Sequence, residues 1–455
     1  MSQISYIKYK DIIEAWRIDA DFFKPEYLKI DETIEKQNYN ELKGLIWKWN
    51  IFSWPFGSSL KSESYTNYWT PFIRISDIQD LFINKENLMY ISEEDSERLN
   101  STTLNIWDIV LSKIWTIWRL SLITSDLWKV NISENNIWLR LQNLSDKEKK
   151  VLLLFLLSKY WQEQIIRQWS WNVQLKINVS NIEELKIPNL QLFNIDKISK
   201  IYDDILYKHE QSKYLYQEAE DLLLTELWLK NHTISHTLTF STTKKAVDEA
   251  WRYDADYFQP KYDGLIEKIE NYKWGWDYVE NCIKVQDKNF IPEEWKLYKY
   301  IALANVSAQW FISDCEENYW ENLPTRARRI LHKWDVIVSS IEWSLSSCAV
   351  IEDEFDWWLC SNWFYVLNSS FFNSECLLVL FKSNIIQSLL KKWCSWTILT
   401  AISKDELNKI KLPLINSQLQ KEISDKIKES FKLRNESKEL LEQAKKMVED
   451  EIEKE

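Results

Sequence analysis

Two long segments of the chain carry apolar residues at the spacing of one face of an α-helix. In residues 196–230, and again in residues 417–455, apolar positions occur at helical spacing with Lys, Glu and Asp between them. The apolar positions are Ile198, Ile201, Ile205, Leu215, Ala219, Leu222 and Leu227, then Ile423, Ile427, Leu440, Ala444, Met447 and Ile452. Each segment therefore predicts one long amphipathic helix whose apolar face needs a partner.

Shorter patterns fill the rest of the chain. Residues 72–78 and 300–306 predict short strands, whereas residues 150–168 and 376–392 predict amphipathic helices. Elsewhere β-branched runs alternate with turn residues. This mixture favours lobes of the α+β class.

The sequence also repeats itself, with the copies in the same order. The letters EAWRIDADFFKPEY at residues 14–27 recur as EAWRYDADYFQPKY at residues 249–262. Residues 107–114 match residues 334–341, and a third match closes each copy, at residues 180–188 and 403–413. The predicted long helices keep the same register, because Ser212, Ala219 and Glu226 lie 225 positions before Ser437, Ala444 and Glu451. Self-similarity of this kind indicates an internal duplication.

We therefore expect an α+β fold of two pseudo-symmetric, mixed α/β lobes separated by two long helices that form an antiparallel coiled coil. The expected parts are residues 1–190 for the first lobe, 191–235 for the first helical spacer, 236–415 for the second lobe and 416–455 for the second spacer. The competing interpretation is two surface helices, each packed on its own lobe.

The composition adds one anomaly, since the 455 residues include 27 Trp but only 4 Gly. Glycine normally supplies about 7% of residues, because turns and helix ends need positive φ. Several Trp lie where glycine is expected, among them Trp334, Trp357 and Trp396. We predict that many of these Trp are glycine in the natural protein, from a lineage that reads the UGA codon as glycine. The alternative is a Trp-rich protein that stacks on bases.

Chemistry-bearing motifs are missing from the sequence. It contains no glycine-rich cofactor loop, no P-loop, no HExxH and no methyltransferase-type Asn-Pro-Pro-Tyr motif, so we expect neither catalysis nor a cofactor. The six Cys lack zinc-type spacing and predict free, mostly buried thiols, while His232 and His236 fit a Ser/Thr-rich linker better than a metal site. The longest apolar run, residues 151–157, is too short for a membrane span, and we expect a cytoplasmic protein.

The chain resembles the specificity subunits of type I restriction-modification systems over nearly its whole length. The segments that carry the resemblance are residues 55–62, 71–78 and 172–178 in the first lobe and residues 323–330, 334–340 and 395–400 in the second. The resemblance implies two target recognition domains, a split site on double-stranded DNA, two methyltransferase subunits and restriction subunits as partners, and no catalysis by this chain. The family also favours glycine where this chain has Trp54, Trp107, Trp115, Trp118, Trp334 and Trp396.

Candidate DNA contacts follow from polar and cationic side chains in the resembling segments, because Arg reads guanine, Gln reads adenine, and Ser or Thr serves either. They are Lys61, Ser62, Tyr65, Arg74, Lys113, Arg119, Gln174 and Lys176 in the first lobe, then Arg326, Arg328, Arg329, Ser346, Ser347, Thr397 and Thr400 in the second. The competing interpretation for each is a solvated or internally paired side chain. Arg17 and Arg252 recur in both copies and therefore predict internal ion-pair anchors, since readers of different half-sites differ.

The formal net charge of -12 opposes a stand-alone DNA binder, which usually has a basic surface. The resemblance implies methyltransferase subunits, which would supply much of the protein surface that encloses the DNA. Helix length would then set the unread gap, since a helix of 35 residues spans about 50 Å, the length of roughly 15 base pairs. The alternative function is a coiled-coil scaffold that binds partner proteins without DNA sequence preference.

Overall fold

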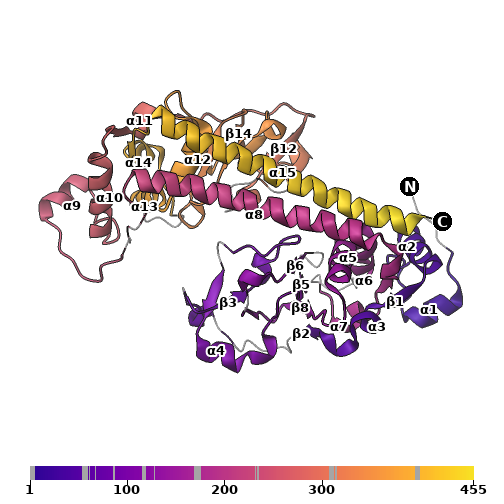
Figure 1. Cartoon of the computed structure of the whole chain (residues 1–455). Helices are drawn as coiled ribbons and strands as arrows, with labels where there is room; N and C mark the ends of the chain where they lie inside the picture. Colours follow the sequence, from indigo (N-terminus) through magenta and orange to yellow (C-terminus); the bar gives the residue numbers. More distant parts are fainter. Residues whose placement is uncertain are drawn as a thin grey trace. The chain divides into compact units, whose positions relative to one another are not determined.

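The computed structural model describes residues 6–53, 60, 62–66, 68–85, 88–114, 119–127, 129–168, 176–230, 232, 235–306, 312, 315–394 and 400–454. The chain mixes helices and sheets and contains two long helices, which confirms the predicted fold class (Figure 1). It divides into two compact units, residues 1–208 with 435–455, and residues 209–434. Each unit thus holds one lobe together with part of both long helices, and the predicted boundaries at residues 190, 235 and 415 stay predictions.

The first unit is built on two main sheets and a short strand pair. The four-stranded sheet has the order β2-β8-β5-β6, the three-stranded sheet has the order β4-β3-β7, and β1 pairs with β9. The strands are β1 (Tyr39–Glu41), β2 (Ile51–Ser53), β3 (Thr70–Ile73), β4 (Met89–Ile91), β5 (Ile109–Ser112), β6 (Leu120–Leu122), β7 (Asn131–Ile132), β8 (Asn136–Leu139) and β9 (Lys186–Pro188). The helices are α1 (Tyr9–Ala15), α2 (Pro25–Lys36), α3 (Leu42–Ile46), α4 (Glu93–Arg98), α5 (Asp146–Leu156), α6 (Lys159–Gln168) and α7 (Val179–Glu183).

The second unit repeats this plan with one additional strand in its second sheet. Its sheets have the orders β11-β18-β15-β16 and β13-β12-β17-β14, and β10 pairs with β19. The strands are β10 (Trp276–Tyr278), β11 (Lys284–Gln286), β12 (Leu297–Ile301), β13 (Glu316–Tyr319), β14 (Ala327–Ile330), β15 (Val336–Ser339), β16 (Cys348–Val350), β17 (Leu359–Ser361), β18 (Phe364–Asn368) and β19 (Lys411–Pro413). The helices are α9 (Lys244–Ala250), α10 (Pro260–Glu270), α11 (Val279–Cys282), α12 (Ser374–Lys382), α13 (Asn384–Trp393) and α14 (Lys404–Asn408). Even the parallel pair β3–β7 has its counterpart, β12–β17.

Four expected elements are shorter than the sequence pattern predicts. The strand expected at residues 300–306 ends at Ile301, and a 3-10 turn follows it at Leu303–Asn305. The strand expected at residues 72–78 ends at Ile73, because the Asp77 carboxylate accepts from the backbone N–H of Arg74 and closes a 3-10 turn. The helix expected at residues 150–168 is two helices, and it breaks where the hydroxyl of Ser158 donates to the carbonyl of Phe155, at 2.7 Å. Ser383 does the same to Leu380, at 2.6 Å, between α12 and α13. A hydroxyl that bonds a backbone carbonyl competes with the next helical turn.

The core of each unit is centred on a short helix that is buried on all sides. Every residue from Val151 to Leu156 in α5, and every residue from Cys376 to Phe381 in α12, is buried. Helices that are apolar all round need cover on every face. The cluster around α5 includes residues of the four-stranded sheet and of both long helices, and so does the cluster around α12.

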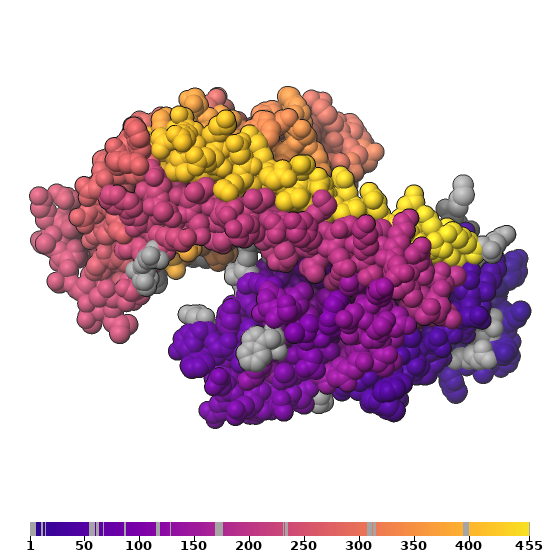
Figure 2. Space-filling model, in the orientation of Figure 1, coloured from indigo at the N-terminus to yellow at the C-terminus, as the bar shows by residue number. Residues whose placement is uncertain are grey.

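The long helices α8 (Ile195–Glu226) and α15 (Ser417–Glu453) pair in opposite directions. In the first unit the Ser437 hydroxyl donates to the carbonyl of Ile205, at 2.9 Å. In the second unit the hydroxyl oxygens of Ser430 and Ser212 lie 3.0 Å apart, and Nζ of Lys426 donates to the carboxylate of Glu218, at 2.8 Å. Residue numbers rise along α8 as they fall along α15, so the pair is antiparallel, and both pictures show the helices side by side (Figures 1 and 2). The helices therefore cover each other as well as the lobes.

Tryptophan occupies most of the strained backbone positions. Among the residues that the structure describes, ten non-glycine residues have positive φ. Nine of them are Trp, with φ between 51° and 93°: Trp16, Trp47, Trp69, Trp107, Trp228, Trp251, Trp295, Trp334 and Trp357. A left-handed conformation costs an L-residue about 1–2 kcal/mol, and glycine nothing. Trp107 and Trp334 occupy equivalent positions before β5 and β15. This distribution supports glycine at these nine positions in the natural protein.

Replacing Trp16, Trp228, Trp251 and Trp295 by Gly is expected to raise the free energy of unfolding by about 1 kcal/mol per position, because strain is relieved and these side chains are more than four-fifths exposed. Urea denaturation measures the change. The control is Trp161→Gly in α6, a fully buried side chain whose loss is expected to cost about 3–5 kcal/mol. A lower stability of the four-site variant, or an intact mass of the natural protein that matches 27 Trp, would contradict the assignment.

Candidate nucleic-acid interface

One end of the four-stranded sheet in the first unit gathers cationic side chains. Strand β2 ends at Ser53, β5 ends at Ser112, and Lys176 lies opposite Ile114 in an isolated antiparallel bridge. The backbone N–H of Ile177 donates to the carbonyl of Lys113, at 3.0 Å. Because their backbones are neighbours, Lys113 and Lys176 lie at the same sheet end.

Lys113 is held at this sheet end by a specific contact. Its Nζ donates to the hydroxyl of Ser53, at 2.7 Å, and the residue is 6% exposed. Burial lowers the pKa of Lys113, and the positive charge of Lys176 lowers it further. An approaching anion such as a phosphate stabilises the charged form of both lysines. Lys113 is thus a buried lysine with a fixed partner, and contact of either lysine with DNA stays a prediction.

The other candidates of the first lobe lie elsewhere or outside the described residues. The carbonyl of Arg119 accepts from the N–H of Ser112, at 3.1 Å, which places Arg119 beside Lys113. Arg74 forms a two-bond ion pair with Asp77, and Tyr65 packs against Phe72 with ring centroids 5.8 Å apart. Burial raises the pKa of Tyr65. The remaining calls on this lobe, Lys61, Gln174 and the side chain of Ser62, fall outside the described part of the chain.

In the second lobe the arginine cluster lies on and next to β14. The guanidinium of Arg326 stacks over Trp363, 4.7 Å from the ring centroid, and that of Arg328 lies 4.9 Å from the centroid of Trp320. Arg329 is instead tied down, because its Nη1 donates to the side chain of Asn289, at 2.9 Å, and to the carbonyl of Asp287. Arg326 is the most exposed of the three arginines.

A second polar group follows β15. Ser346 is exposed and Ser347 buried in the turn between β15 and β16. The carbonyl of Thr400 accepts from the N–H of Glu342, at 3.0 Å, beside the bridge between Ile341 and Ala401. That bridge corresponds to the Ile114–Lys176 bridge of the first lobe. Thr397 falls outside the described residues, and DNA contact by all these side chains stays a prediction.

Arg17 and Arg252 are the internal anchors that their repetition predicts. Arg17 bonds both oxygens of Asp19, at 2.8 and 3.0 Å, and Arg252 bonds both oxygens of Asp254, at 2.8 and 2.7 Å. Arg252 also donates to the carbonyl of Cys394 after α13, at 2.8 Å. The bond from Arg17 lowers the pKa of Asp19, and for Asp254 the opposing effect of burial is outweighed by Arg252. Both arginines are therefore paired with a carboxylate of their own lobe.

Two contact residues at these surfaces were missed by sequence reasoning. Ser53 bonds Lys113, and Asn289 bonds Arg329. Both are polar residues at or just after the end of a strand, since Ser53 is the last residue of β2 and Asn289 follows β11, and this was the available signal. Their partners lie 60 and 40 positions away in the chain, so only the folded sheets bring the pairs together.

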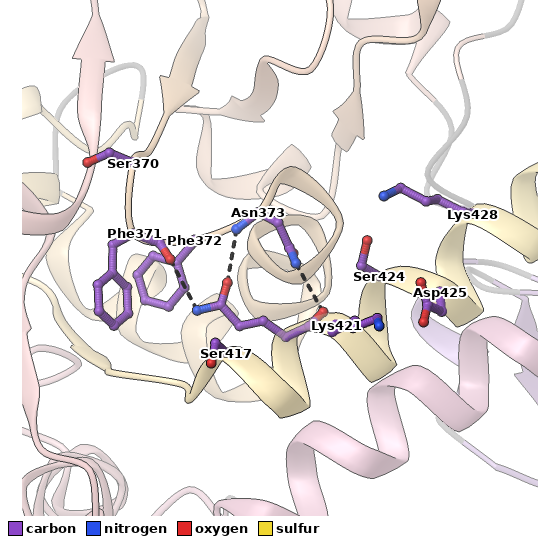
Figure 3. Close-up of a pocket in the computed structure, with 10 residues that line it drawn as sticks. Ser370, Phe371, Phe372, Asn373, Ser417, Lys421, Ser424, Asp425 and Lys428 are labelled. Carbon is purple, nitrogen blue, oxygen red and sulfur yellow. Dashed lines mark hydrogen bonds between the residues drawn. The ribbon is translucent and has the colours of Figure 1, made fainter.

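A cavity of about 530 Å³ opens between the start of α15 and the loop before α12. There the N–H of Asn373 donates to the side chain of Gln420, and its amide nitrogen to the carbonyl of Gln420, both at 3.0 Å (Figure 3). These bonds tie the second lobe to α15. The cavity is lined by Ser370, Phe371, Phe372, Asn373, Ser417, Gln420, Lys421, Ser424, Asp425 and Lys428.

The cysteines are free, and four of the six are buried. Burial raises the pKa of the Cys348, Cys376 and Cys394 thiols to about 12, which keeps them protonated and unreactive. Burial also lowers the pKa of His232. Within the residues that the structure describes, no group of three or more His, Cys, Asp or Glu side chains is placed to hold a metal ion. None of the helices in that part of the chain has the length and apolar character that crossing a membrane requires.

Comparisons with known proteins give structural neighbours only. No family model matches the chain, and no curated protein matches it. A crystal structure of the type I restriction-modification S subunit from M. genitalium is 14% identical, covers 92% of this chain and 96% of its own, and has a TM-score of 0.37. The HsdS subunit from Thermoanaerobacter tengcongensis is 11% identical, with coverages of 91% and 96% and a TM-score of 0.29. A chain from a structure of the type I R-M system, solved to study complex assembly, is 11% identical, with coverages of 91% and 97% and a TM-score of 0.28.

The structural neighbours of this chain are type I specificity subunits. At these identities and TM-scores the likeness by itself assigns neither a fold nor a function to this chain.

Arg252→Ala is expected to lower the free energy of unfolding at pH 7 by about 2 kcal/mol, because a half-buried carboxylate loses its charged partner. The difference between wild type and variant should shrink as the pH falls below the ordinary Asp pKa of about 4. The sign follows from Asp254, whose folded-state pKa is lowered: its contribution is present above the unfolded pKa and is lost as the pH falls through the folded one.

Urea titrations between pH 3 and pH 7 measure this difference, and Arg17→Ala provides the matched variant in the first lobe. A stability difference that is independent of pH over this range would show that the ion pair is not its source.

Proposed function

We propose that the chain is the sequence-specific DNA-binding specificity subunit of a type I restriction-modification complex. It recognises a split site on double-stranded DNA and directs adenine methyltransferase subunits, two per chain, and restriction subunits, which carry the catalysis. One observation carries the proposal: a single chain contains two units whose sheets share one strand order apart from the extra strand β14, and each unit includes part of the same antiparallel helix pair. A split site needs two readers held in a fixed relation.

The two units differ at the positions where a reader has to differ. By strand register, Ser53 in β2 corresponds to Asp287 after β11. By the repeat, Lys113 corresponds to Ser340, and by the matching bridges Lys176 corresponds to Ala401. The framework is kept, since the Arg17–Asp19 pair recurs as Arg252–Asp254. Constant anchors with different sheet-end side chains suit two half-sites of unlike sequence.

The net charge of -12 fits a division of labour within a complex. Phosphate contacts supply most of the sequence-independent affinity of DNA-binding proteins. A chain with this charge relies on its partners for much of that affinity, so the isolated subunit is expected to bind DNA weakly. The same charge favours the alternative, a scaffold that binds partner proteins without DNA sequence preference.

The deciding experiment co-expresses the chain, with glycine at the nine strained Trp positions, together with the methyltransferase encoded beside it. Methylated adenines are then mapped across a random-sequence DNA library. A split motif that loses one half when either lobe is replaced by that of another specificity subunit supports the proposal. Co-purification without sequence preference supports the scaffold, and no co-purification contradicts both.

Lys113→Met and Lys176→Met are each expected to reduce the slope of log affinity against log salt by about 1, because each variant loses one phosphate contact. Fluorescence anisotropy of the assembled complex on its own DNA site, from 50 to 300 mM salt, measures the slope. The control is Lys147→Met in α5, an exposed lysine that pairs with Asp196 instead. An unchanged slope in both sheet-end variants would remove these lysines from the interface.

A further inference from the structure

In each unit an ion pair and a serine join the buried lobe helix to one of the two long helices, α5 to α8 in the first unit and α12 to α15 in the second. We call α8 the own long helix of the first lobe and α15 that of the second. In the first unit Lys150 of α5 lies 2.7 and 2.8 Å from the two carboxylate oxygens of Asp203 in α8, and it donates to the hydroxyl of Ser199, at 3.2 Å. In the second unit Glu375 of α12 accepts from the hydroxyl of Ser424 in α15, at 3.1 Å, and lies 3.6 Å from Nζ of Lys428. Figure 3 shows Ser424 and Lys428 on α15, near Asn373, the residue that precedes α12.

These two sets of residues occupy equivalent positions in the duplicated chain. Glu375, Ser424 and Lys428 each lie 225 positions after Lys150, Ser199 and Asp203, which is the spacing that relates the two long helices. Bonding confirms the alignment of the lobe helices. Ser158 and Ser383 each donate to the carbonyl three residues earlier, and Gln162 and Gln387 each donate to the carbonyl six residues earlier.

The sign of the charge is reversed between the two units. In the first, the lobe helix carries the cation and the long helix the anion, whereas in the second the lobe helix carries the anion. The serine is common to both, since a hydroxyl accepts from Lys150 in one unit and donates to Glu375 in the other. Only the charged residues therefore distinguish the two junctions at these positions.

We propose that this reversed ion pair matches each lobe to its own long helix and prevents the lobes from exchanging partners, within one chain or between two copies. Duplicated domains are prone to this kind of exchange. Apolar packing discriminates poorly, because α5 and α12 both present six consecutive buried apolar residues. If α5 met α15, Lys150 would face Lys428, and if α12 met α8, Glu375 would face Asp203.

Burial makes the mismatch costly. The side chains of the lobe residues are largely buried, at 13% exposure for Lys150 and 4% for Glu375, whereas their helix partners are more than half exposed. Such a pair adds little net stability when it is formed. A buried charge that faces a like charge is much less favourable, and repulsion against the wrong partner is an effective source of specificity. The reversed pair thus acts on the choice of partner more than on stability.

The test gives both units the same charge order, with the anion on the lobe helix and the cation on the long helix. The double variant Lys150→Glu with Asp203→Lys keeps an ion pair in the first unit but copies the charge order of the second. We expect its monomer to keep the wild-type thermal midpoint, while the fraction of exchanged dimer after refolding rises about threefold or more. Native mass spectrometry of two differently tagged copies, refolded together from urea, counts the exchanged dimers.

The matched control reverses the code in both units. A quadruple variant with Lys150→Glu, Asp203→Lys, Glu375→Lys and Lys428→Asp is expected to return to the wild-type fraction of dimer. The proposal is overturned if the double variant refolds with the wild-type fraction, or if the quadruple variant exchanges as much as the double one. Neither outcome bears on DNA recognition, so the result is independent of the proposed function.

Discussion

The pairing of α8 with α15 is the constraint on which the rest of the structure depends. Each helix has one apolar stripe that it cannot cover alone, and each contributes residues to the cores of both units. The helices approach closely, since the hydroxyls of Ser430 and Ser437 reach backbone carbonyls of the facing helix, at 2.7 and 2.9 Å. The chain therefore has to return to its first unit after the second is complete. A unit of this kind is assembled from both ends of the chain.

The long helices and the repeat could be predicted because they depend on spacing within the sequence. Helix ends and strand ends could not, because single hydroxyl and carboxylate contacts decide them. Ser158 divides an apolar run that has unbroken helical periodicity, and Asp77 ends a strand whose β-branched pattern continues. These competing bonds depend on local geometry rather than on the apolar pattern.

Only part of the candidate interface could be predicted from the sequence, namely which cationic residues it contains. Lys113 and Lys176 were both named as candidates from the sequence, and the bridge at Ile114 brings their backbones together. Sequence alone could not show which cations are already engaged. Arg74 is bonded by Asp77, and Arg329 by Asn289, so both have partners within the lobe. Such pairing engages cationic side chains within the lobe, so the number of basic residues alone does not predict a basic binding surface.

The strained tryptophans have a consequence for inheritance. If their codons are UGA, the gene can be read only in cells that translate this codon as an amino acid. In a host that uses UGA as a stop, synthesis would end at the first strained position, Trp16, before α2 and the first sheet are made. The gene would then be confined by the genetic code to lineages that translate UGA, and its transfer to other cells would yield only a short peptide.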